Sequence, residues 1–129
     1  FPDVIDEVLF VLNDPDLAHV FAANTLTEVN ITATLPELSD SQILGQIDRL
    51  IIEPDKITLI DFKSNHTPAK TVNQVPDGLL RQLGAYAAAL AQIYPNREIQ
   101  PAILWTKNAY LQHIPHEVVR NALLSTTTS

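Results

Sequence analysis

The sequence predicts one α/β domain, with a mixed sheet of about five β-strands flanked by helices. The first observation is the order of the patterns along the chain, which is helices, three strands, a helix, two strands and a helix. The second is that strand-like alternation and helix-like stripes occupy separate segments. The third is size, because 129 residues with 46% hydrophobic content can bury a single core.

The N-terminal segment, residues 1–24, is expected to hold two short helices. Val4, Ile5 and Val8 recur at a helical spacing with acids in the first turn, and a Pro follows at position 15. We expect residues 25–124 to form the core of a single domain spanning 1–129. The polar end, residues 125–129, is expected to be a frayed tail.

Three strands are predicted next. Residues 26–35 alternate between apolar and polar side chains, which is typical of a half-buried strand. Residues 43–52 and 57–63 are mostly apolar and are joined at "EPDK", where Pro54 suits the second position of a tight turn. The last two segments therefore predict a β-hairpin.

The second half of the chain returns to a helix, two strands and a helix. The polar residues 64–78 predict an irregular loop. A helical stripe starts from Asp77 and stops before Pro95. The segments "EIQPAILWT" and "AYLQHI" predict two strands around a Lys-Asn turn, and "PHEVVRNALL" predicts the last helix.

Composition excludes several classes of function. With no cysteine there is no disulfide, thiolate zinc site or iron–sulfur cluster, which fits a cytoplasmic protein. No apolar run approaches the roughly 18 residues of a membrane span. A net charge of −7 with eight scattered Lys and Arg argues against a broad nucleic-acid surface. Because the chain opens without Met, we expect it to be a piece of a longer protein.

The predicted hairpin carries two acids, Asp48 and Asp61, and a lysine, Lys63. A two-residue loop pairs Glu53 with Lys56, and the numbers of paired residues in an antiparallel hairpin have a constant sum. The register therefore places Asp48 opposite Asp61. Asp61 and Lys63, two apart on one strand, share a face.

Two carboxylates facing each other on neighbouring strands need a compensating interaction. At ~5 Å and an effective dielectric of ~20 they repel by about 3 kcal/mol. A raised pKa, a nearby cation such as Lys63, or a bound divalent metal would relieve this. The hairpin alone leaves two interpretations open, a structural acid–acid–lysine cluster and a metal site for phosphoryl chemistry.

Further motifs add a family resemblance. "GQIDRL" and "IDFKSN" at this spacing, followed by a helix with Gln82 and Tyr86 on one face, resemble the PD-(D/E)XK nuclease core. The chain is most similar to the C-terminal nuclease domain of RecB/AddA-type helicase–nucleases. The segment "IYPNREIQPAILWT" also looks like the AddA version, and the likeness covers nearly the whole chain.

The resemblance implies a restriction-endonuclease-like fold and a metal-dependent nuclease site. Asp48, Asp61 and the main-chain carbonyl of Phe62 would bind Mg²⁺, with Mn²⁺ able to substitute and Ca²⁺ binding without activity. Lys63 would act near the attacking water or the scissile phosphate. The remaining catalytic candidates, which would line the site and contact the DNA strand, are Gln82 and Tyr86.

The resemblance also implies partners and a role. The partners are DNA, the helicase region of the same parent chain and an AddB-like partner subunit, in double-strand break repair and recombination, with no membrane involved. The family's upstream metal-binding histidine has no counterpart, because His19 stands in a different context. No phosphate-binding loop of an ATPase occurs. The alternative is a non-catalytic, nuclease-like scaffold that binds DNA or a partner subunit.

Other polar and aromatic residues are expected to be structural. Glu28 lies on the polar face of the first strand, where an acid is usually solvated, although it could approach the site. Trp105 is expected in the core. His113 and His116 have no acid or cysteine beside them that would make a metal site, and we expect them at the surface.

Overall fold

A computed structural model describes residues 25–64, 71–107 and 109–125. The helices predicted within residues 1–24 and the tail after residue 125 lie outside these ranges. The elements are β1 (Thr25–Leu35), η2 (Pro36–Leu38), β2 (Ser41–Ile52), β3 (Lys56–Lys63), η3 (Val72–Gln74), α2 (Asp77–Ile93), β4 (Glu98–Trp105), β5 (Tyr110–His113) and α3 (His116–Ser125). The predicted strands and the two C-terminal helices are confirmed to within about two residues at each end, and the predicted loop contains the short η3.

The strands form one five-stranded sheet in the order β1-β2-β3-β4-β5. Strands β3 and β4 are parallel, whereas β1–β2, β2–β3 and β4–β5 are antiparallel. The connection between the parallel strands contains α2, as a parallel pair requires a crossover. The prediction of a mixed α/β sheet is therefore confirmed.

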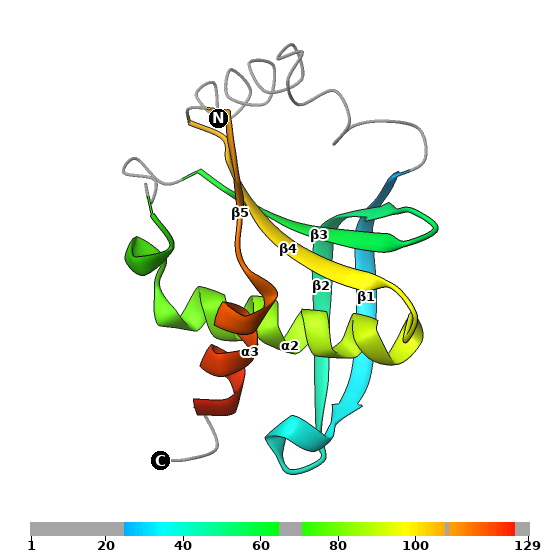
Figure 1. Cartoon of the computed structure of the whole chain (residues 1–129). Helices are drawn as coiled ribbons and strands as arrows, with labels where there is room; N and C mark the ends of the chain where they lie inside the picture. The colour runs from blue at the N-terminus through cyan, green and yellow to red at the C-terminus, as the bar shows by residue number, and fades with distance from the viewer. Residues whose placement is uncertain (1–24, 65–70, 108, 126–129) are drawn as a thin grey trace.

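One face of the sheet packs against α2 and α3 (Figure 1). This main core contains Trp105, which is 1% exposed as predicted, and the fully buried Leu83 and Leu90 of α2. A smaller cluster on the other face contains Ile51, Ile60 and Leu104. None of the helices in the described ranges is long and apolar enough to cross a membrane.

The β2–β3 hairpin has the register expected from its turn. Glu53 N donates to Lys56 O at 2.9 Å, and the pairs above the turn include Ile52 with Ile57. The paired residues continue to Arg49 and Ile60 and stop there. The described ladder therefore ends at the point where the predicted pair of acids begins.

Candidate active site

Strand β2 places Asp48 against the main chain of β3. Instead of an ordinary ladder bond, the Phe62 amide donates to Asp48 Oδ2 at 2.7 Å. A hydrogen bond to a carboxylate is stronger than one between neutral groups, so it compensates for the ladder that ends at Arg49 and Ile60. The Asp48 side chain thus joins two strands whose backbones have begun to separate.

The path of β2 changes at Asp48. Ile47 and Leu50 both belong to the core on the α2 side, although side chains three apart on a regular strand face opposite ways. The neighbouring strand is irregular at the same level, because Glu28, which the β1–β2 register would pair with Asp48, has a left-handed φ of 51°. The sheet is therefore distorted on both sides of this acid, and Glu28 itself is exposed as expected.

Strand β3 places Asp61 and Lys63 on the α2 side of the sheet, in register with the buried Ile103 and Trp105. The Asp61 side chain is only 12% exposed, and its Oδ2 lies 3.1 Å from Lys63 Nζ. Despite this ion pair, Asp61 Oδ2 is buried and accepts no hydrogen bond from any residue that the structure describes. A buried carboxylate oxygen without a hydrogen bond is costly, and a bound cation would satisfy it.

The two acids are electrostatically coupled. Burial, which disfavours the charged form, raises the pKa of Asp61 to about 6. The positive charge of Lys63 opposes this change, and the negative charge of Asp48 adds to it. At neutral pH a buried, incompletely compensated negative charge therefore remains between β2 and β3.

The Phe62 main chain faces the same gap. In a strand, the N–H and C=O groups of one residue point to the same side. Because the Phe62 N–H bonds to Asp48, its carbonyl also points toward β2. Lys63 O, by contrast, points toward β4 and accepts the Thr106 amide at 2.8 Å. Two carboxylates and a carbonyl are the oxygen ligands that Mg²⁺ and Mn²⁺ use in proteins.

Gln82 and Tyr86 come together on α2, where Gln82 Nε2 donates to Tyr86 Oη at 3.2 Å. The Tyr86 ring rests on Gly45 of β2, because a Cβ at this position would overlap the hydroxyl and lie 2.7 Å from Cζ. No hydrogen bond within the described part of the chain joins this pair to Asp48 or Asp61. The structure thus places them against the strand that carries Asp48.

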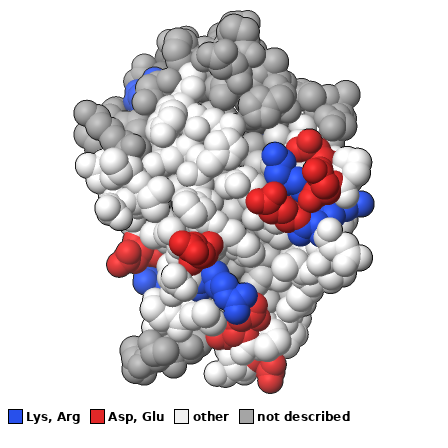
Figure 2. All heavy atoms as spheres, viewed as in Figure 1, with Lys and Arg blue, Asp and Glu red and all other residues white. Residues whose placement is uncertain are grey.

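The charged surface is mixed rather than basic. On the face shown in Figure 2, acidic and basic side chains lie in small mixed groups separated by wide uncharged areas. Within the described ranges, no three His, Cys, Asp or Glu side chains gather as a ready metal cluster. His113 and His116 are exposed, as predicted. The carboxylate pair with the Phe62 carbonyl is therefore the best-supported candidate centre.

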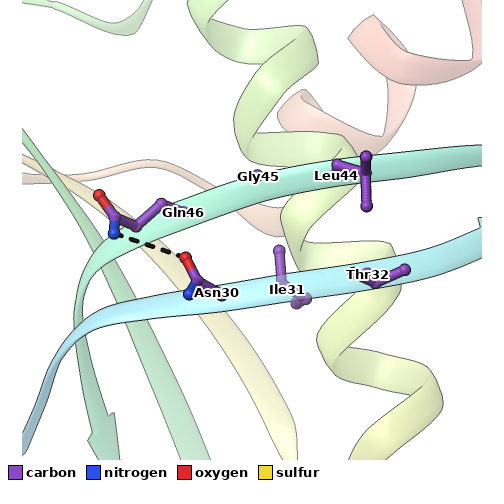
Figure 3. Close-up of a pocket in the computed structure, with 6 residues that line it drawn as sticks. All are labelled: Asn30, Ile31, Thr32, Leu44, Gly45 and Gln46. Carbon is purple, nitrogen blue, oxygen red and sulfur yellow. Dashed lines mark hydrogen bonds between the residues drawn. The ribbon is translucent and has the colours of Figure 1, made fainter.

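A shallow hollow of about 530 Å³ lies on the β1–β2 hairpin, lined by Asn30, Ile31, Thr32, Leu44, Gly45 and Gln46 (Figure 3). Gln46 Nε2 donates to Asn30 Oδ1 at 3.5 Å, and the Leu44 side chain is 76% exposed. The lining carries no ionisable side chain that could perform chemistry. Gln46 pairs with Asn30, so the register expected to set it opposite Lys63 does not continue beyond the described ladder.

Sequence reasoning missed two features of this site. The Asp48–Phe62 bond could not be predicted, because a side chain replacing a ladder bond has no signature in a strand pattern. The seat of Tyr86 on Gly45 did leave a signal, since a glycine inside a strand often marks a close approach by another group. The signal was available, but the sequence alone does not reveal the approaching side chain.

Comparisons with known proteins bear on this site. A family model described as the PD-(D/E)XK nuclease superfamily matches residues 7–126. Over 69 residues the chain is 35% identical to an ATP-dependent helicase/nuclease subunit of Oenococcus oeni, a match that covers 53% of this chain and 6% of that protein. The crystal structure of SSO0001 covers 98% of this chain, and the chain covers 69% of it, with 12% identity and a TM-score of 0.47.

Proposed function

Because the chain belongs to the PD-(D/E)XK nuclease superfamily, we propose that it is the nuclease domain of an AddA-like bacterial helicase–nuclease that hydrolyses DNA phosphodiester bonds with Mg²⁺. The carrying observation is the buried Asp61 oxygen that lacks a hydrogen bond, beside Asp48 and the Phe62 main chain. A structural acid–lysine cluster would be expected to satisfy this oxygen. The proposal gives it a cation as its partner.

Each residue has a separate part in the proposed reaction. Asp48, Asp61 and the Phe62 carbonyl would hold the metal, which when bound polarises the scissile phosphate and lowers the pKa of a water. Asp48 is held in place by the Phe62 amide, so it is oriented before a metal arrives. Lys63 keeps its ammonium group beside Asp61 and, at 36% exposed, can also reach a phosphate.

Gln82 and Tyr86 form the helix side of the proposed site. We assign them to the edge that borders the bound strand, with the Gln82 amide and the Tyr86 hydroxyl already hydrogen-bonded to each other. The wider setting extends the same proposal to exonuclease action in double-strand break repair and recombination in the cytoplasm. Its partners there would be the helicase region of a longer parent chain and an AddB-like subunit. The matched relative, whose printed name describes a helicase/nuclease component, supports this setting.

The direct test is cleavage of linear DNA by the 129-residue chain in Mg²⁺ and in EDTA. We expect cleavage only with the metal, and a loss on the order of 10²- to 10³-fold in Lys63→Ala, since removing one charge stabiliser of a transition state has about this effect. Lys56→Ala is the matched control, because Lys56 lies at the opposite end of β3. Equal activity in Lys63→Ala and Lys56→Ala would reject the catalytic role.

The alternative, a non-catalytic scaffold of the same fold, predicts a different pattern. Such a protein would bind DNA or a partner subunit without cutting in any divalent cation, and Asp61→Asn would leave that binding unchanged. Asp55→Asn, which makes the same chemical change at the exposed β2–β3 turn, serves as its control. DNA binding without cleavage in the unmodified chain would favour this alternative.

A further inference from the structure

We propose that Gly45 is a positioning residue of the candidate metal site, because the Tyr86 ring seated on it fixes the part of β2 that carries Asp48. The inference rests on the proposed function and adds to it a residue outside the predicted set of ligands and catalytic groups. Gly45 touches neither metal nor substrate in this account. It acts through Asp48.

The first step is the way β2 is held. Its pairing with β3 ends at Arg49 and Ile60, whereas its pairing with β1 continues down to Ser41. Below Arg49, the β1–β2 ribbon is therefore held to the rest of the sheet by side-chain contacts rather than by a backbone ladder. Whatever fixes the ribbon at that level also fixes the approach of Asp48 to β3.

The second step is the contact that holds the ribbon. Helix α2 rests on it at two points, where the Tyr86 ring covers Gly45 and where Gln92 Nε2 donates to Thr34 O at 3.0 Å. The helix itself is anchored to the sheet by the fully buried Leu83. In Figure 3, α2 passes behind the hairpin beside Gly45.

The third step is the need for glycine. Gly45 has no left-handed φ, so backbone freedom does not explain it. What it provides is space, since any Cβ would overlap the Tyr86 hydroxyl. Its neighbours Leu44 and Gln46 face the other side of the ribbon by strand alternation, so only position 45 can receive the ring.

The fourth step links this contact to Asp48. The strand changes phase between Ile47 and Leu50, and an irregular strand segment keeps its path only if its surroundings hold it. On one side of this segment is the Tyr86–Gly45 contact, and on the other is the bond from the Phe62 amide to Asp48. Displacing the ring would loosen the first and so lengthen the second.

Gly45→Ala tests this with limited risk of unfolding, because the atoms it meets are the end of a side chain that can move. In the metal-free chain, we expect the Phe62 amide to exchange with solvent on the order of tenfold faster, as its bond to Asp48 weakens. The Glu53 amide at the hairpin turn should be unchanged, because its bond to Lys56 O lies beyond the paired segment. This readout requires neither metal nor activity.

The second readout is metal binding by calorimetry with Mn²⁺. Loss of a group that orients a ligand typically weakens metal affinity on the order of 10- to 100-fold, and we expect Gly45→Ala to fall in this range. Cleavage should recover at high Mn²⁺, since the catalytic groups remain. Gly78→Ala is the matched control, because a Cβ there meets only Arg81 at an ordinary 3.9 Å.

A double-mutant cycle separates positioning from a direct role of Tyr86. If both residues act through one contact, Tyr86→Ala and the double variant with Gly45→Ala should bind Mn²⁺ equally weakly. Additive losses would overturn the inference, as would a wild-type rate of Phe62 exchange or a wild-type Mn²⁺ affinity in folded Gly45→Ala. If the unmodified chain binds no divalent cation, the proposed function fails, while the Phe62 exchange rate still decides whether Gly45 positions Asp48.

Discussion

Replacing Asp61 by Asn should make the metal-free protein more stable at neutral pH. The side chain is 12% exposed, and burial raises its pKa from the ordinary 3.8 to about 6. Each pKa unit corresponds to about 1.4 kcal/mol, so the ionised form costs the fold at most about 3 kcal/mol. Asn keeps the shape, removes the charge and can donate to the Asp48 carboxylate. We therefore expect Asp61→Asn to gain about 1–3 kcal/mol at pH 8 in EDTA.

The sign of the pH dependence follows from the same shift. A carboxyl whose pKa is higher in the folded state binds its proton more tightly there, so this contribution to stability is complete below pH 4. It is lost as the pH rises through about 6. The difference in unfolding free energy between Asp61→Asn and the wild type should therefore be near zero at pH 4, grow between pH 4 and 7, and level off above.

Urea unfolding followed by circular dichroism at several pH values in EDTA measures this difference. Asp55→Asn, at the exposed turn, is the matched control and should show no such trend. Mg²⁺ should reverse the order of stability, because a ligand at 100 times its dissociation constant stabilises the wild type by about 2.7 kcal/mol. A variant that is less stable than the wild type at pH 8 in EDTA would refute the reasoning, since it would mean that the Lys63 ion pair outweighs burial.

Three further predictions follow from other contacts. Mn²⁺ affinity should rise with pH through about 6 with release of a proton, because Asp61 must ionise to bind, and a pH-independent affinity by calorimetry would contradict this. Gly84→Ala should destabilise the fold by about 1–3 kcal/mol in urea, since a Cβ there overlaps a main-chain carbonyl of α3, and an unchanged midpoint would show that the helices separate freely. Trp105→Phe should cost about 1–3 kcal/mol or more by removing the 2.9 Å bond to Gln112, which is 3% exposed, and a cost near zero would mean that this buried amide finds another partner.

The fold was predictable because its patterns are local. Alternation along residues 26–35 and the Pro54 turn fixed two strands and the hairpin register, down to the pair Arg49 and Ile60. The parallel pairing of β3 with β4 followed from the intervening helix. Apolar periodicity and turn residues are properties of neighbouring positions, so a single sequence is enough to read them.

The site was predictable only in part. The register brought Asp48 toward Asp61, and the strand period put Lys63 beside it, as the structure shows. The actual arrangement depends on where β2 leaves β3, and that depends on long-range packing of α2 against Gly45. Such contacts join residues far apart in the chain, and no local pattern records them.

The most direct test of the central claim is paramagnetic broadening by Mn²⁺ in an amide NMR spectrum of the 129-residue chain. Mn²⁺ held by both carboxylates would lie beside the Phe62 main chain, so the amides of Asp48, Asp61 and Phe62 should broaden first, at substoichiometric metal. The account predicts that Asp61→Asn abolishes this pattern. Broadening that instead begins at the exposed acids of the β2–β3 turn, or that survives in Asp61→Asn, would contradict it.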